Sequence, residues 1–205
     1  MAKKSFSIKE SIKYGWKTVW NQPNIILYLL IAVASPQIIS FLFDHIFSDA
    51  SDIATSIFRA AITILSMVLS IGMIRIALNV YDKKVLKFEN LYQDWRLLGW
   101  YLLAGLLNAV VVCIGLILLL IPGIHAALRL SLWPYIMVEG EKYPVKALKK
   151  SWVITKGVTL KLLGFYFVQG LLMILGVMAL GVGLIIALPV ISLAQVYIYK
   201  KIASK

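Results

Sequence analysis

The chain of 205 residues has very few of the side chains on which enzymes and metalloproteins depend. It holds one cysteine, Cys113, two histidines, His45 and His125, and nine acidic residues. A single cysteine in an apolar run excludes a disulfide framework or a cysteine metal site. His125 has no acidic residue close to it in the sequence and only one other histidine in the chain, so it does not make a metal centre. The sequence also lacks a nucleophile motif, a phosphate-binding glycine loop and a carboxylate pair. We therefore expect no enzymatic activity, no cofactor and no metal.

Apolar residues, in contrast, are abundant. They make up 61% of the chain, and only 15% of its residues are charged, a composition that predicts an integral membrane protein. An apolar helix of about 20 residues crosses the hydrocarbon core of a bilayer, which is about 30 Å thick. By this criterion the sequence predicts one all-α membrane domain with six transmembrane helices, near residues 24–43, 53–80, 99–121, 124–138, 158–180 and 183–200.

The fourth predicted span, residues 124–138, is unusually short. As a straight helix it would reach only about 22 Å, and Pro134 interrupts it. The alternative is a re-entrant segment that enters and leaves the membrane on the same side. A short or tilted complete span is favoured, because the loss of one crossing would move the C-terminal lysines to the other side of the membrane.

Basic residues are strongly segregated along the chain, whose net charge is +12. With six crossings, eighteen of the 21 lysines and arginines fall on one side, and the opposite loops offer only Asp44, Asp49 and Asp52. Because basic loops resist translocation, we expect a prokaryotic cytoplasmic (inner) membrane with both termini in the cytoplasm. The lysines lie at the ends of apolar runs, which favours anionic lipid of the cytoplasmic leaflet over nucleic acid as the partner. Arg75, near the inner end of its span, is expected to extend to the headgroups.

Three further segments have apolar residues at helical spacing with charges on the opposite face. They are predicted to be amphipathic interfacial helices on the cytoplasmic face, near residues 7–20, 86–97 and 144–156. The apolar stripe of each carries one tryptophan suited to anchor it at the headgroup level, namely Trp16, Trp95 and Trp152. The lysines expected to contact anionic lipid are Lys9, Lys13, Lys17, Lys146, Lys149 and Lys150.

Each predicted interfacial helix precedes two spans. The chain is therefore interpreted as three helix-plus-hairpin units of one repeated kind. The alternative, that amphipathic inner loops simply accompany many helix bundles, stays open.

Arg129 is the most informative basic residue inside an apolar stretch. It lies one helical turn after His125, so both are expected to project to one face near the outer leaflet, and Arg59 is expected at a similar depth. A guanidinium binds phosphate through two N–H groups and stays charged, so these three residues are predicted to contact a lipid phosphate. In the structural alternative, Arg59 pairs with Asp52, and Arg129 reaches headgroups or bonds to Asn108 or to exposed backbone carbonyls.

Neutral polar residues inside the spans support a different function. Asn108, Gln169 and Gln195 lie in predicted spans, and Pro36 and Pro189 predict kinks that free backbone carbonyls. These groups are typical of a path through a small transporter or channel. That function is the alternative to a non-catalytic protein that interacts with lipid or serves as an accessory or scaffold. No mid-membrane carboxylate is present to couple transport to protons or cations, and an enzyme acting on lipid ranks third.

Small residues four positions apart predict close helix packing, as at Gly105 with Ala109 and at Ala179 with Gly183. Packing within one bundle and association between proteins explain such pairs equally well. A homo-oligomer or a membrane protein partner therefore stays open.

One stretch resembles a known family. The pattern Ala147-Leu148-x-x-Ser151-Trp152-x-x-Thr155-Lys156-Gly157, preceded by Ile121-Pro122-Gly123 and Arg129, is similar to the membrane domain attached to some glycerophosphoryl diester phosphodiesterases and found in related uncharacterised bacterial inner-membrane proteins. The resemblance covers roughly residues 115 to 200 and implies a multi-pass membrane domain. It does not imply the phosphodiesterase activity, because the catalytic barrel of those enzymes is a separate soluble domain of about 250 residues.

Overall fold

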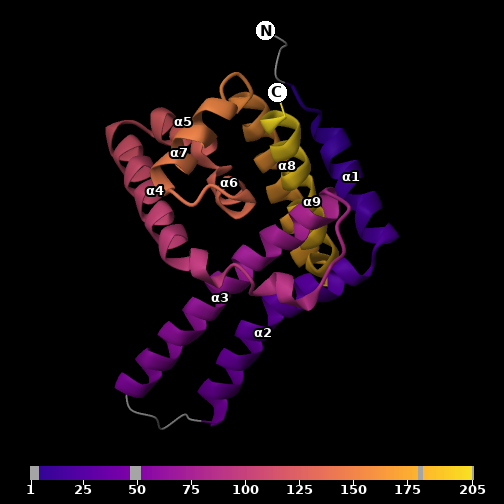
Figure 1. Ribbon diagram of the computed structural model, residues 1–205, viewed down its shortest axis with the longest axis vertical. Helices are drawn as coiled ribbons and strands as arrows, with labels where there is room; N and C mark the ends of the chain where they lie inside the picture. Colours follow the sequence, from indigo (N-terminus) through magenta and orange to yellow (C-terminus); the bar gives the residue numbers. More distant parts are fainter. Residues whose placement is uncertain (1–4, 47–51, 180–181, 205) are drawn as a thin grey trace.

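The computed structural model describes residues 5–46, 52–179 and 182–204, apart from the side chains at positions 29, 44, 46, 52 and 182. The predictions made for Lys3, Lys4, Asp49 and Lys205 lie outside these residues, as do those for the side chains of Asp44 and Asp52. Within the described ranges all regular structure is helical (Figure 1). The elements are α1 (Ile8–Asn21), α2 (Asn24–Ile46), α3 (Asp52–Tyr81), the 3-10 turns η1 (Phe88–Leu91) and η2 (Trp95–Leu97), α4 (Leu98–Leu118), α5 (Leu120–Leu130), α6 (Trp133–Glu139), α7 (Pro144–Ile154), α8 (Thr159–Met178) and α9 (Val182–Ala203).

Five helices, α2, α3, α4, α8 and α9, are long and apolar enough to cross a membrane. At 1.5 Å per residue, the 20 residues of α8 extend about 30 Å, the thickness of the hydrocarbon core. These helices correspond to five of the six predicted spans. The described chain is therefore an all-helical protein of membrane type.

The predicted span at residues 124–138 is not one helix. Its place is taken by α5 with 11 residues and α6 with 7 residues, which reach about 16 Å and about 10 Å. Pro134 stands in the first turn of α6, where its missing N–H needs no partner, so it begins a new helix and does not kink a longer one. Neither α5 nor α6 alone has the length of a span.

The helices are arranged around a central α6. Four consecutive residues of α6, Tyr135 to Val138, are buried, and α7 packs against α4, α5 and α6. Helices α4 and α5 form a tight hairpin: a methyl group at Gly115 would lie 2.9 Å from Cα of Gly123. In Figure 1, α2 and the first half of α3 project together from the rest of the molecule, toward the lower left.

Helix α1 packs along α9, and small residues take part in its buried face beside the apolar ones. The buried face consists of Ser11, Gly15 and Val19, whereas Trp16 is 52% exposed. A methyl group at Gly15 would lie 2.3 Å from the carbonyl oxygen of Val190 in α9. The small residues of α1 thus allow a close contact between helices that a count of hydrophobic residues does not predict.

The second predicted interfacial helix, residues 86–97, is not an α-helix. The 3-10 turns η1 and η2 replace it. Side chains compete with helical hydrogen bonding here: Asn90 Oδ1 accepts the backbone N–H of Lys87 at 2.7 Å, and Asp94 is bound by Arg75. The local polar contacts therefore outweigh the helical pattern of apolar residues.

The third predicted interfacial helix exists as α7. It buries Ala147, Leu148 and Ser151 and leaves the lysines exposed. The helix itself is confirmed, while its position in a membrane surface stays a prediction.

Candidate functional site

The structure brings together two of the three predicted phosphate contacts. Arg129 lies in the last turn of α5, and its guanidinium carbon is 4.3 Å from the ring centroid of Trp152 in α7. Its Nη2 donates a hydrogen bond to the Trp152 carbonyl. His125, one turn earlier, has its ring centroid 6.2 Å from the Trp152 ring centroid. Arg129 and His125 therefore share one helix face, and that face meets α7.

Arg129 also links the ends of two helices. Its carbonyl oxygen accepts hydrogen bonds from Ser151 Oγ at 2.9 Å and from Thr155 Oγ1 at 3.0 Å. The last carbonyls of a helix lack partners within the helix, so the ends of α5 and α7 satisfy each other. This is the structural alternative, in which Arg129 bonds to an exposed carbonyl. The contact with Trp152 also places Arg129 beside the lysine-rich helix α7, whereas the sequence predicted the two on opposite sides of a membrane.

Arg59 does not join this group. It is exposed on the first half of α3, which projects with α2 at one end of the molecule, whereas α5 lies at the other end (Figure 1). The structure therefore does not bring Arg59 together with Arg129 and His125. The reason is the divergence of the α2–α3 hairpin from the body, which the helix lengths alone do not reveal.

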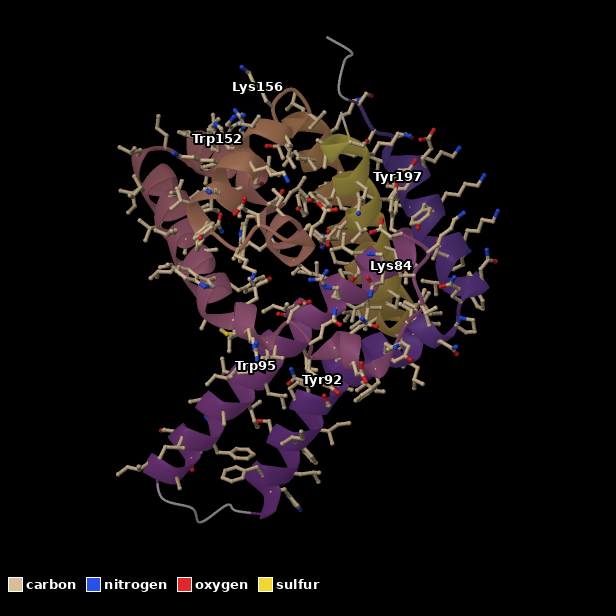
Figure 2. All side chains as sticks on the ribbon, viewed as in Figure 1. Lys84, Tyr92, Trp95, Trp152, Lys156 and Tyr197 are labelled. Carbon is tan, nitrogen blue, oxygen red and sulfur yellow. The ribbon has the colours of Figure 1, made fainter. Side chains whose placement is uncertain are left out.

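A polar pocket of about 330 Å³ forms where α3, the η1–η2 segment, α4 and the connection from α6 to α7 meet. In Figure 2 the η1–η2 segment, with Tyr92 and Trp95, lies where the projecting hairpin leaves the body. We call it the cationic pocket because three of its side chains are basic. Its lining consists of Arg75, Gln93, Asp94, Arg96, Leu97, Trp100, Met137, Gly140 and Lys142.

The charges in the cationic pocket do not cancel. Arg75 and Asp94 form a two-point ion pair, with Nε to Oδ2 at 2.6 Å and Nη2 to Oδ1 at 3.0 Å. Arg96 lies 5.7 Å from the Trp95 ring centroid, and among the described residues neither Arg96 nor Lys142 has a hydrogen bond or an ion pair. The pocket therefore presents two uncompensated positive charges.

An aromatic wall borders the same pocket. Trp100, in the first turn of α4, is partly exposed, and its ring centroid lies 6.3 Å from that of Tyr143. Tyr143 in turn has Lys146 Nζ 4.7 Å from its ring centroid. Indole and phenol rings beside cations are typical of the headgroup level of a membrane.

The pattern of residues along the chain does not predict the cationic pocket. Arg75 was expected to extend toward headgroups, but Asp94 holds it. Arg96 and Lys142 are two of the eighteen basic residues that six crossings would place on one side. An arginine inside the end of an apolar helix does require a partner. The segment that follows offers Asp82, Glu89 and Asp94, and the pattern alone does not choose among them.

The predicted interfacial contacts all lie at the surface. Trp16 and Trp95 are more than half exposed, and Trp152 is 38% exposed because Arg129 covers part of its ring. The six lysines are exposed on the outer faces of α1 and α7: Lys9, Lys13, Lys17, Lys146, Lys149 and Lys150.

A second ionic cluster joins three helix ends. Lys200 Nζ in α9 lies 2.9 Å from Asp82 Oδ1 and 2.8 Å from Glu139 Oε1, and the Tyr199 hydroxyl donates to Glu139. Burial by itself would raise the pKa of Glu139, but the hydrogen bonds from Lys200 and Tyr199 and the charge of Lys200 outweigh it, so the pKa is lowered. The cluster fixes α6 relative to α3 and α9.

The interior contains a chain of neutral polar groups. The Tyr135 hydroxyl donates to Gln195 Oε1 at 2.5 Å, and Gln195 Nε2 donates to Gln169 Oε1 at 2.9 Å. A cavity of about 210 Å³ adjoins this chain. Its lining consists of Ser70, Met73, Ile74, Ala77, Tyr135, Ser192 and Gln195.

The prediction of a polar path is met in part. Gln169 and Gln195 are in direct contact, whereas Asn108 lies on α4 and outside the lining of this cavity, with its Oδ1 buried and without a hydrogen-bond partner in the described part of the chain. Pro189 lines a separate apolar groove between α2 and α9. Asn108, the Gln169–Gln195 pair and Pro189 are therefore not arranged as one path.

No protein-family model, curated protein or solved structure matches the chain. The resemblance to the membrane domain attached to glycerophosphoryl diester phosphodiesterases stays a prediction.

Proposed function

We propose that this chain is a non-catalytic protein of a prokaryotic cytoplasmic membrane that binds the phosphate headgroup of an anionic lipid in the cationic pocket. The observation that carries the proposal is the pair of uncompensated cations, Arg96 and Lys142, beside Trp100 in a pocket of about 330 Å³. With the basic segments and both termini in the cytoplasm, as the charge distribution favours, the pocket opens toward the cytoplasmic leaflet.

Each side chain has a distinct part in this proposal. The guanidinium of Arg96 can bind two phosphate oxygens through parallel N–H groups, and Lys142 adds a point charge. Arg75 is held by Asp94 and keeps the pocket open on the α3 side. Trp100 packs at the level of the glycerol and headgroup region, where its amphipathic ring is favoured.

The exposed lysines of α1 and α7 support the same role in a less specific way. The surface potential of an anionic leaflet attracts basic residues with about 1 kcal/mol each. These lysines therefore orient the protein on the leaflet, while the cationic pocket selects a headgroup. Lipid binding of this kind suits an accessory or scaffold protein, and it is compatible with the multi-pass membrane domain that the family resemblance implies.

Native mass spectrometry of the protein released with its own lipids tests the proposal. The double variant Arg96→Ala/Lys142→Ala is compared with Lys9→Ala/Lys17→Ala, which removes the same charge from exposed positions outside the pocket. We expect a phosphate-bearing lipid on the wild type and on the control, and its loss from the pocket variant. Equal retention by all three proteins would contradict the proposal.

A small transporter or channel for an unidentified neutral solute is the second candidate, and the hydrogen-bonded chain of Tyr135, Gln195 and Gln169 beside a cavity favours it. Flux of glycerol and urea into reconstituted vesicles, measured by light scattering, tests it. If the protein is a transporter or channel, the wild type should give a solute flux and the Gln195→Leu variant should give none. This candidate ranks second because the lining of that cavity holds no charged group that would couple transport to an ion gradient.

A further inference from the structure

The α4–α5 hairpin ends in a turn without polar side chains. Between Ala109 and Ile124 there is no charged, amide or hydroxyl side chain. The five residues from Ile117 to Ile121 are each at least 66% exposed. Large apolar side chains of this kind gain about 1.5–3 kcal/mol each when they leave water, so this turn belongs in hydrocarbon and not in water or among headgroups.

The other long hairpin has the opposite character. The last turn of α2 and the connection to α3 include Asp44, His45 and Asp49 in their sequence, as expected of a hairpin end that emerges from a membrane. The sequence at the turn of the α4–α5 hairpin therefore suits hydrocarbon, whereas the sequence between α2 and α3 suits water.

The base of the α4–α5 hairpin is tied to a basic segment. Arg129 binds Trp152, and Ser151 and Thr155 bind the Arg129 carbonyl. Lys156 follows directly and is exposed, at the upper edge of the molecule beside Trp152 (Figure 2). A lysine at the centre of a bilayer is unfavourable by about 2.5–3.5 kcal/mol or more, so the base of the hairpin lies at the cytoplasmic boundary of the membrane.

From this base the hairpin is too short to reach the other side. The 11 residues of α5 span about 16 Å, roughly half of the hydrocarbon thickness. The first turn of α4 lies beside the start of α7, because Trp100 contacts Tyr143. The second half of α4 packs along α5, and the close approach of Gly115 to Gly123 holds the two segments together.

One residue of the turn, Leu119, satisfies both of its backbone polar groups inside the hairpin. Leu119 is extended, yet its N–H donates to the Gly115 carbonyl at 3.1 Å, and its carbonyl accepts the N–H of Gly123 at 3.3 Å. Irregular backbone inside a membrane must satisfy its polar groups internally. At Leu119 both groups are satisfied within the hairpin.

We infer that α4 and α5 form a half-membrane hairpin that enters from the cytoplasmic side, ends among lipid acyl chains near the bilayer centre, and returns to the cytoplasmic side. The chain then crosses the membrane four times, through α2, α3, α8 and α9. Removal of two crossings, unlike removal of one, leaves all basic segments on the same side, so the charge distribution that favours six crossings equally favours four. The inference rests on the orientation given in the proposed function.

The depth of residue 121 tests this inference. Cys113 is the single cysteine, so Cys113→Ala combined with Ile121→Cys gives one thiol at the hairpin tip, where the exposed Ile121 contributes nothing to the core. A nitroxide attached there is expected to be accessible to oxygen, which concentrates at the bilayer centre, and inaccessible to an aqueous nickel complex. Reaction of Ile121→Cys with a membrane-impermeant maleimide from outside would overturn the inference, because six crossings place the tip at the outer surface.

Two reference positions separate this outcome from a failure of the proposed orientation. In the same Cys113→Ala protein, His45→Cys is expected to react with the impermeant maleimide only from outside, and Lys156→Cys only from inside. Reversed labelling of this pair would contradict the orientation in the proposed function, while the depth at residue 121 would still decide the hairpin. Ile117→Cys provides a second tip position with the same expected depth.

Discussion

At the scale of single residues, Arg129 illustrates how one side chain can serve two roles that a sequence does not distinguish. Its guanidinium lies over an indole ring, its Nη2 binds a carbonyl, and its own carbonyl binds two hydroxyl groups. Each of these contacts joins α5 to α7. Arg129 therefore links two helices, although an arginine in an apolar segment of sequence also suggests a phosphate site.

Arg129→Ala is expected to destabilise the protein and to leave lipid binding intact. Loss of one charged hydrogen bond and one cation–π contact predicts a decrease in unfolding free energy of about 2–4 kcal/mol. Thermal unfolding in detergent measures the stability, and native mass spectrometry measures the lipid. An unchanged midpoint together with lost lipid would restore Arg129 as a direct phosphate contact.

Glu139 is expected to make the stability of the protein depend on pH in the acidic range. Its pKa in the folded protein is lowered from the ordinary value of 4.5. Its contribution to stability is therefore fully present above pH 4.5 and is lost as the pH falls through the lower pKa of the folded protein. Glu139→Gln removes this titration. We expect the variant to be less stable than the wild type at neutral pH, and the difference to shrink as the solution is acidified below pH 4.5. If the stability difference between the wild type and Glu139→Gln is the same at every pH, ionisation of Glu139 is not coupled to folding.

At the scale of helices, the position of α1 makes a sharp prediction. Gly15→Ala places a methyl group 2.3 Å from the Val190 carbonyl oxygen, so α1 must move away from α9, with an expected loss of about 1–3 kcal/mol. Gly170→Ala in α8 is the matched control, because nothing lies within 4 Å of its added methyl group. The control is expected to stabilise its helix by up to about 1 kcal/mol.

Thermal unfolding of the two glycine variants distinguishes the packed α1 from a helix that lies free on the membrane surface. A free α1 would gain stability from Gly15→Ala in the same way that α8 gains it from Gly170→Ala. Opposite signs for the two substitutions support the packing of α1 on α9.

The helices that the sequence predicts well are those set by length and composition. The apolar runs that became α2, α3, α8 and α9 are long enough that no other conformation satisfies their backbone in a membrane. The failures occur where a distant residue decides. Arg75 binds Asp94 in the segment 86–97, which is not an α-helix, and Ser151 and Thr155 bind the end of α5 from 22 and 26 residues away.

At the scale of the whole molecule, the cationic pocket shows why charge patterns locate a surface more readily than a site. The segregation of lysines predicts which side faces the cytoplasm, since it depends only on sequence order. The pocket requires Arg75, Arg96, Trp100 and Lys142 from α3, η2, α4 and the segment before α7 to meet. Nothing in their spacing along the chain indicates that meeting.

The surface lysines and the pocket respond differently to salt, which allows their contributions to be separated in one protein. Adding a phospholipid with an anionic headgroup in detergent is expected to raise the unfolding midpoint, because a ligand that binds the folded state stabilises it.

Raising the ionic strength from about 0.1 M to about 1 M shortens the Debye length from about 10 Å to about 3 Å. This screens the exposed lysines of α1 and α7 more than the cations of the pocket. The wild type should therefore retain part of the stabilisation at high salt, and Arg96→Ala/Lys142→Ala should retain none. A phospholipid with a zwitterionic headgroup serves as the control for the acyl chains. If the wild type loses all of the lipid-induced rise in its unfolding midpoint at high salt, the lipid is bound only by the surface charge and not by the pocket.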